Sequence, residues 1–112
     1  MKKEYVPVRG DMVWITAHPR TGHEQSGRRP VVVLSPESYN RKVGLAMFCP
    51  ITGRIKGYPF EVLIPGESAV SGVILADQAK NFDWRARKAE FICRLPSVVV
   101  EEVLNKLLLL LE

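Results

Sequence analysis

Polar residues suited to acid–base or phosphate chemistry gather in the stretch HEQSGRRP, residues 23–30, directly before the apolar run VVVL. Glu24, Arg28 and Arg29 stand out, because the entry to a buried strand does not need a carboxylate and two guanidinium groups. A carboxylate can accept a proton, and a guanidinium group binds anionic oxygens while it stays charged. Thr52 adds a hydroxyl just past the end of another apolar run. These four side chains form the candidate site.

Other kinds of catalytic site lack support in the sequence. The chain contains no HExxH, no GxxxxGK[ST] and no GxSxG motif. Cys49 and Cys93 lie among apolar neighbours without the spacing of metal ligands, so we expect buried thiols and neither a metal nor a cofactor. His18 and His23 could act as an acid and a base, but two histidines in an exposed loop are more often simply solvated.

Positive charge is concentrated in the first half of the chain. Lysines and arginines minus acids give 10 − 4 = +6 for residues 1–56 and 6 − 8 = −2 for residues 57–112. The basic excess lies along Arg20, Arg28, Arg29, Arg41, Lys42, Arg54 and Lys56. A one-sided basic surface is typical of proteins with an anionic partner, most often nucleic acid. The alternative is that these residues only keep a small domain soluble.

Length and composition predict one globular domain, spanning residues 1–112. With 46% hydrophobic and 25% charged residues, the chain can form a core without disulfides. No apolar run approaches the roughly 20 residues that span a bilayer. The N-terminus lacks the apolar segment of a secretory signal. We therefore expect a soluble, cytoplasmic protein without a membrane partner.

Short β-branched and aromatic runs, bounded by Gly, Pro and Asp, predict a β-rich domain. The expected strands are Asp11–Thr16, Pro30–Leu34, Leu45–Ile51, Phe60–Ile64, Gly72–Leu75 and Glu90–Leu95. We expect a long loop at 17–28, one helical turn at Ser38–Lys42, and a turn or short helix at FDWRAR, residues 82–87.

The C-terminal segment has the period of an α-helix instead. Its apolar face consists of Val100, Val103, Leu104, Leu107, Leu108 and Leu111, and Pro96-Ser97 provides a start signal. Leu109 and Leu110 overfill this face and could pack against the end of the sheet or against a second copy of the chain. The predicted fold is mainly β (α+β): a small barrel with short peripheral helices and a C-terminal α-helix.

Several short motifs follow one another along nearly the whole chain, from Tyr5 to the terminal helix. They are Gly10-Asp11, Gly22-x-Glu24-Gln25-x-Gly27-x-Arg29-Pro30 before VVVLS, Tyr39-Asn40, Pro50-x-Thr52, KGYPFE at 56–61, Gly72-Val73-x-Leu75-x-Asp77-Gln78, and WRAR at 84–87. A single motif of this kind has little specificity, whereas the ordered set is specific. It resembles the MazF/PemK family of toxin endoribonucleases.

This resemblance implies an SH3-like barrel that forms a homodimer and is silenced by an acidic, partly disordered antitoxin. It implies metal-independent cleavage of single-stranded RNA (mRNA) at short sequence motifs, with Arg29 and Thr52 as catalytic residues and Glu24 as an assisting one. Attack by a ribose 2′-OH would leave a 2′,3′-cyclic phosphate. The RNA-binding residues expected beside them are His18, Gln25, Arg28, Arg54, Lys56, Tyr58, Asp77 and Gln78. Tyr58 suits base stacking, because it lies among cations.

Two positions depart from the family pattern. Members commonly carry acids where this chain has Thr16-Ala17-His18, and a second hydroxyl residue where it has Gly53. Neither change replaces Arg29 or Thr52, so they concern cleavage specificity more than activity.

Plainer interpretations stay open beside the catalytic one. Arg29 could bridge Glu24 or Asp77 on the surface, and the Thr52 hydroxyl could serve only its own turn. Two other function classes also stay open: a gyrase poison of the same barrel type, and an inactive barrel that binds RNA or a protein partner. A gyrase poison would need neither Arg29 nor Thr52.

Overall fold

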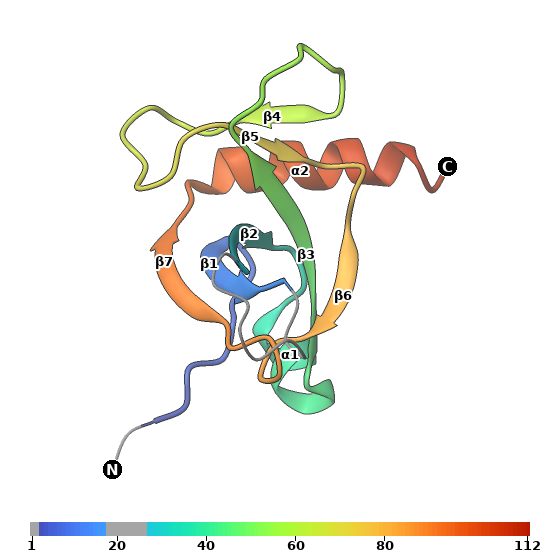
Figure 1. Cartoon of the computed structure of the whole chain (residues 1–112). Helices are drawn as coiled ribbons and strands as arrows, with labels where there is room; N and C mark the ends of the chain where they lie inside the picture. The colour runs from blue at the N-terminus through green and yellow to red at the C-terminus, as the bar shows by residue number, and fades with distance from the viewer. Residues whose placement is uncertain (1–2, 18–26) are drawn as a thin grey trace.

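Short antiparallel strands dominate the computed structural model, which describes residues 3–17 and 27–112 (Figure 1). The strands are β1 (Asp11–Thr16), β2 (Arg28–Val33), β3 (Leu45–Thr52), β4 (Glu61–Leu63), β5 (Val73–Leu75), β6 (Lys80–Asp83) and β7 (Glu90–Arg94); the helices are α1 (Glu37–Val43) and α2 (Ser97–Leu109). The prediction of a mainly β fold with a C-terminal helix is therefore confirmed.

One sheet runs in the order β4-β5-β3-β2-β1-β7, and β6 pairs with β3 beside this path. One edge of β3 holds β2, while its other edge holds β6 along the first half and β5 at the end. The outermost strands of the path, β4 and β7, do not pair with each other in the described part of the chain. The sheet therefore stays open, and the predicted barrel holds only in a loose sense.

The prediction for residues 82–87 was wrong at its start. Phe82 and Asp83 end β6, and the turn begins only at Trp84. The sequence Lys80–Asp83 lacks the apolar pattern that predicts a strand, because it contains a single apolar residue and three of its four side chains are exposed. β2 also begins earlier than expected, at Arg28, so Arg29 lies inside a strand.

Alternating side chains of the sheet fill two hydrophobic clusters. Met12 and Val32 belong to the larger cluster, where they pack with Val103 of α2. Their neighbours Val13 and Val31 belong to the second cluster. Because successive side chains of a strand point to opposite faces, the two clusters lie on opposite faces of the sheet.

The fully buried residues of α2 all lie in its first half, and Leu104 and Leu107 are partly buried against the same cluster. Val100 and Val103 pack against the sheet, as the helical period predicts. Leu109 and Leu110 are 59% and 49% exposed, so they do not pack against the end of the sheet. Over the described residues, neither helix combines the length and the apolar character needed to cross a membrane.

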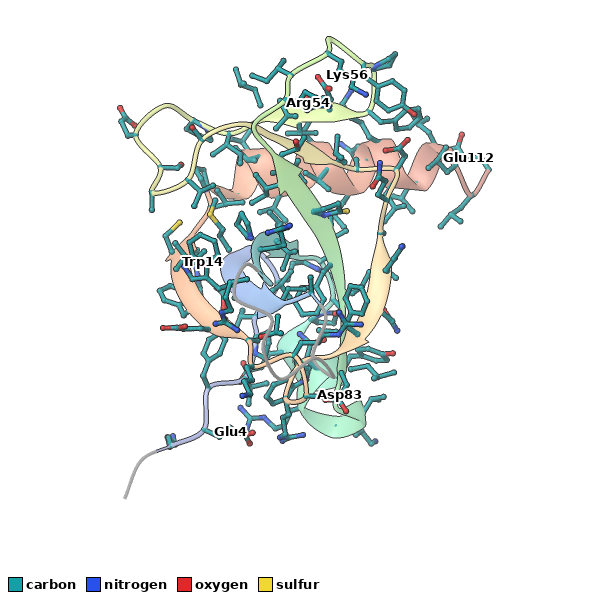
Figure 2. The ribbon with its side chains drawn as sticks, in the orientation of Figure 1. Glu4, Trp14, Arg54, Lys56, Asp83 and Glu112 are labelled. Atoms are coloured by element: carbon teal, nitrogen blue, oxygen red, sulfur yellow. The ribbon has the colours of Figure 1, made fainter. Side chains whose placement is uncertain are left out.

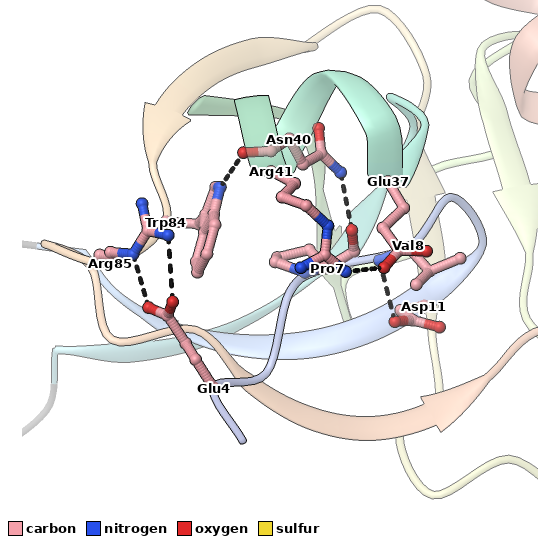
Figure 3. Close-up of polar contacts among 9 residues, drawn as sticks. All are labelled: Glu4, Pro7, Val8, Asp11, Glu37, Asn40, Arg41, Trp84 and Arg85. Atoms are coloured by element: carbon pink, nitrogen blue, oxygen red, sulfur yellow. Dashed lines mark hydrogen bonds and ion pairs between the residues drawn. The ribbon is translucent and has the colours of Figure 1, made fainter. Parts of the chain in front are cut away.

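Asn40 is a fully buried polar residue that joins three segments (Figure 3). Its side-chain amide donates to the backbone oxygens of Pro7 (2.8 Å) and Ser35 (3.0 Å), and its carbonyl oxygen accepts from the Ser35 hydroxyl. The backbone oxygen of Asn40 accepts from the indole nitrogen of Trp84 at 2.9 Å. One residue of α1 thus ties the N-terminal segment and the turn after β6 to the β2–α1 connection.

The Gly10-Asp11 motif has a structural role at the start of β1. Asp11 is buried, and its Oδ2 accepts from the Tyr5 hydroxyl and from the backbone N–H of Val8 (3.1 Å), while Arg94 lies 3.3 Å from Oδ1. Burial, and then the hydrogen bond to Asp11, raises the pKa of Tyr5. Gly10 has a φ of 95°, which favours glycine.

Replacing Asn40 by alanine should destabilise the protein. The change leaves the backbone oxygens of Pro7 and Ser35 buried without their donor, which should lower the free energy of unfolding by about 1–3 kcal/mol. Urea denaturation followed by circular dichroism measures this change. Ser38→Ala, on the exposed side of the same helix, is the matched control and should be nearly neutral. Equal stability of the two variants would contradict the role assigned to Asn40.

Candidate active site

Arg29 and Thr52 lie at the adjoining ends of the paired strands β2 and β3. The paired register runs from Val33 opposite Phe48 to Val31 opposite Pro50, and Arg29 and Thr52 each lie two residues beyond its last pair. Both side chains then share one face of the sheet with Val31 and Pro50. Two predicted catalytic residues from distant parts of the sequence therefore lie at the adjoining ends of adjacent strands.

The Thr52 hydroxyl keeps a proton to donate. Its oxygen accepts a hydrogen bond from the backbone N–H of Arg54 at 3.1 Å, which is the turn role considered above. A hydroxyl can accept with a lone pair and donate at the same time. The Thr52 hydroxyl can therefore stabilise the turn after β3 and at the same time donate to an anionic oxygen on its exposed side.

Two cavities, each of about 250 Å³, adjoin at Gln78, which lines both of them. The threonine cavity, as we name the first, is lined by Thr52, Arg54, Lys56, Tyr58, Glu61, Leu75, Asp77 and Gln78. The arginine cavity, the second, contains Arg29. Most of the predicted RNA-binding residues therefore line one cavity, and the predicted catalytic pair is divided between the two.

The loop between β3 and β4 carries two cations of the threonine cavity, Arg54 and Lys56 (Figure 2). Its shape depends on Glu61, whose carboxylate accepts from the backbone N–H groups of Lys56 and Gly57, both at 3.0 Å. Gly57 has a φ of 79°, a backbone conformation that favours glycine. Sequence reasoning did not select Glu61; its position in KGYPFE, just after a turn, was the available signal.

Tyr58 and Asp77 form a hydrogen-bonded pair in the threonine cavity. The Tyr58 hydroxyl donates to Oδ2 of Asp77, and the tyrosine side chain is partly exposed. This hydrogen bond is the main cause that raises the pKa of Tyr58, so the phenol stays protonated at neutral pH. The pair holds an aromatic ring in place beside two cations, which suits the stacking of a base.

Arg28 is held by contacts within the protein. Its guanidinium group donates to Oγ1 of Thr16 (2.9 Å), to the backbone oxygen of Lys88 (3.0 Å) and to the carboxylate of Glu90 (2.9 Å). These contacts join β2 to β1 and to the start of β7. The structure does not place Arg28 in either cavity, and its contact with RNA stays a prediction.

Apart from Arg29 and Gln78, the described residues that line the arginine cavity were not selected from the sequence as site residues, and three of them lie in or just after β6. Lys80 and Phe82 come from β6, and Arg87 comes from the turn that follows it. The WRAR motif drew attention to this region. Because β6 was not predicted from the sequence, the side chains that line the cavity together with Arg29 could not be identified.

Three other predicted residues, His18, Glu24 and Gln25, lie outside the described residues, as does His23. The described ends of this segment, Ala17 and Gly27, are joined by a backbone hydrogen bond. The assignment of Glu24 as an assisting residue therefore stays a prediction.

The prediction of a buried thiol is confirmed for Cys49, whereas Cys93 is only half-buried. Burial raises the pKa of the Cys49 thiol to about 12, which leaves it protonated at neutral pH. Within residues 3–17 and 27–112, no group of three or more His, Cys, Asp or Glu side chains is arranged to hold a metal ion.

Several known proteins are similar to this chain. The model of the PemK-like, MazF-like toxins of type II toxin–antitoxin systems matches residues 8–111. The endoribonuclease toxin MazF of Escherichia coli K12 is 51% identical over 89 residues, which cover 80% of this chain and 79% of that protein. The endoribonuclease PemK of Escherichia coli is 33% identical over 105 residues, covering 88% and 77%.

Solved structures agree with these sequence matches. A crystal structure of the MazE–MazF complex of Deinococcus radiodurans matches with a TM-score of 0.88 and 50% identity, covering 96% of this chain and 97% of that chain. A crystal structure of MazF from the same organism gives a TM-score of 0.86 and 52% identity, covering 96% and 98%.

Proposed function

This chain belongs to the PemK-like, MazF-like toxin family of type II toxin–antitoxin systems, and from this premise we propose that it is a sequence-specific endoribonuclease that cleaves single-stranded mRNA in the cytoplasm. The observation that supports the proposal is that Arg29 and Thr52, from the paired strands β2 and β3, line two cavities that share Gln78. A strand that crosses from one cavity to the other at Gln78 would pass both a guanidinium group and a hydroxyl, and both could bind one of its phosphates.

The proposed reaction is an internal transfer of the phosphate. The ribose 2′-oxygen forms a bond to the adjacent phosphorus, and the bond from phosphorus to the 5′-oxygen of the next nucleotide breaks. The 2′-OH proton goes to a base, and the departing 5′-oxygen receives a proton. The products are a 2′,3′-cyclic phosphate and a 5′-hydroxyl.

Arg29 and Thr52 would act on the charge that builds up on the phosphate oxygens. The planar guanidinium group of Arg29 matches two of these oxygens and remains charged throughout. The Thr52 hydroxyl would donate to the same phosphate. Because a fixed guanidinium group can supply the positive charge that a metal ion would otherwise provide, we propose that the reaction is metal-independent.

The reaction also requires two proton transfers, one from the 2′-OH and one to the 5′-oxygen. Glu24 is the proposed base for the 2′-OH proton. Arg29 is proposed to bind the phosphate and not to act as the general acid, because a guanidinium group keeps its proton and its charge.

The threonine cavity is proposed to hold nucleotides on one side of the cleaved bond. Arg54 and Lys56 would contact phosphates, and Tyr58 would stack on a base while Asp77 holds its hydroxyl. Gln78, at the wall between the cavities, would contact the strand close to the cleaved phosphate. His18 and Gln25 are proposed to extend this RNA surface.

Two protein partners follow from the family. The similar MazF of Deinococcus radiodurans is found in a complex with MazE, and we assign this chain a cognate, acidic and partly disordered antitoxin that lies along the RNA-binding groove. A symmetric homodimer would cover the leucines at the end of α2, of which Leu111 is 75% exposed.

Replacing Arg29 by alanine should reduce RNA cleavage by at least about 100-fold, because it removes the charge that stabilises the transition state. Thr52→Ala should reduce cleavage by about 10- to 100-fold, since it removes one hydrogen bond to a charged group. Digestion of a long single-stranded RNA in EDTA, followed on a gel, measures both effects. Arg41→Ala, an exposed arginine on α1, is the control and should cleave normally. Wild-type cleavage by Arg29→Ala would refute the assigned site.

Modified substrates test the chemistry of the proposed reaction. A 2′-deoxy or 2′-O-methyl group at the cleaved nucleotide should abolish cutting at that bond, because the nucleophile is absent. On unmodified RNA, mass spectrometry should find the cyclic phosphate and the 5′-hydroxyl with EDTA present. Cutting of the blocked bond, or a requirement for added magnesium, would point to a different reaction.

Competition binding tests the shared groove for antitoxin and RNA, and sedimentation equilibrium tests the dimer. A saturating acidic antitoxin peptide should displace labelled RNA, and Lys56→Ala should weaken the binding of both, because they share a cation. Sedimentation equilibrium of the free protein should give twice the mass of one chain. Simultaneous binding of peptide and RNA without loss of affinity would rule out a shared groove, and a monomeric mass would rule out the dimer.

A further inference from the structure

The arginine cavity has apolar walls and a basic rim. Its apolar surface includes Val31, Phe48, Pro50 and Phe82, and its charged residues are Arg29, Lys80 and Arg87. No carboxylate is among the described residues that line it. At about 250 Å³ it is smaller than the roughly 300–1,000 Å³ of pockets for drug-sized ligands, which suits a single planar ring system. The aromatic walls and the positive charge of the described rim residues match a nucleobase joined to phosphates.

Arg87 and Phe82 form a fixed platform in this cavity. The guanidinium carbon of Arg87 lies 4.1 Å from the centroid of the Phe82 ring, and Nη1 donates to the backbone oxygens of Thr16 (3.3 Å) and Ala17 (2.6 Å). The Phe82 ring in turn stacks with Phe48, with centroids 6.1 Å apart. Bases stack on guanidinium planes as well as on aromatic rings. Since the platform is held before any ligand arrives, little ordering is needed on binding.

The position of the cavity relates it to the cleaved bond. Arg29 lines the arginine cavity, Thr52 lines the threonine cavity, and Gln78 lies between the two. A phosphate bound by both Arg29 and Thr52 therefore lies at the wall between the cavities. The nucleotides before and after this phosphate extend in opposite directions, one toward each cavity.

We propose that the arginine cavity is a second base-binding subsite, which takes the base on the opposite side of the cleaved phosphate from the base that stacks on Tyr58. The base rests on the Phe82–Arg87 platform, and the ammonium group of Lys80 pairs with the neighbouring phosphate. This inference rests on the proposed endoribonuclease function and extends it, because it assigns sequence selection to β6 as well as to the β3–β4 loop.

A thermodynamic cycle between RNA bases and the platform tests the subsite. The probe is a short, labelled 2′-O-methyl RNA carrying the sequence that the protein cuts best in a long RNA or, if it cuts none, binds best from a random pool. Each base is removed in turn as an abasic nucleotide, and binding is measured by fluorescence anisotropy. At one position the wild-type protein should lose about tenfold or more in affinity, as expected for a lost base stack. In Phe82→Leu this loss should shrink to about threefold or less at that position only, because coupled groups do not add.

Lys80→Gln provides a second variant whose fold is not at risk, because Lys80 is exposed. It should lower the slope of log affinity against log salt by about one, as for one lost phosphate contact. Lys42→Gln makes the same charge change on α1 and should leave the slope unchanged.

The outcomes separate this inference from the proposed function. If the wild-type protein does not cleave RNA, but the affinity loss at one abasic position still shrinks in Phe82→Leu, the proposed nuclease function is refuted and the subsite is supported. Normal cleavage with the same abasic losses in wild type and Phe82→Leu, or equal salt slopes for the two lysine variants, would refute the subsite alone. Melting temperatures of all variants confirm that folded proteins are compared.

Discussion

The antiparallel register between β2 and β3 is the constraint on which the candidate site depends. Side chains alternate along a strand, so a slip of one residue would turn Arg29 or Thr52 to the opposite face. The same slip would expose Val31 or Phe48, which are buried in the second hydrophobic cluster. The apolar packing therefore sets the register, and the register places the polar pair at the open ends of the two strands.

Hydrogen bonds at the far end of β2 reinforce this register. The chain passes from β2 to β3 through α1, and Asn40 holds that connection to the N-terminal segment and to Trp84. The Ser35 hydroxyl accepts from the backbone N–H of Met47, and Leu34 donates to the backbone oxygen of Met47, both at 2.8 Å. Arg29 and Thr52 are thus aligned by contacts that lie at the opposite end of their strands.

The second edge of β3 explains why the cavities come as a pair. β5 pairs with Ile51 and Thr52, β6 pairs with residues 45–48, and the chain crosses between them through Asp77 and Gln78. Gln78 therefore lies at the crossing and forms part of both cavities. The split edge of one strand accounts for two adjacent cavities at the ends of β2 and β3.

Local patterns in the sequence were sufficient for the strands with clear apolar runs, such as Asp11–Thr16, and for the terminal helix from its period. The ordered motifs were sufficient for the family, because their spacing is a property of the chain itself. The net charge indicated a basic surface, but it could not separate Arg28, which is held by β1 and β7, from Arg54 and Lys56 in the threonine cavity.

Only the tertiary structure decided that β6 exists and that Phe82 and Arg87 lie beside Arg29. It also decided that Glu61 shapes the β3–β4 loop. β6 has one apolar residue, so its own side chains bury little apolar surface, and its pairing with β3 stabilises it as a strand. The physical reason is that a strand of low apolar content is stabilised by hydrogen bonds to a distant strand, and no local pattern of side chains records that partner.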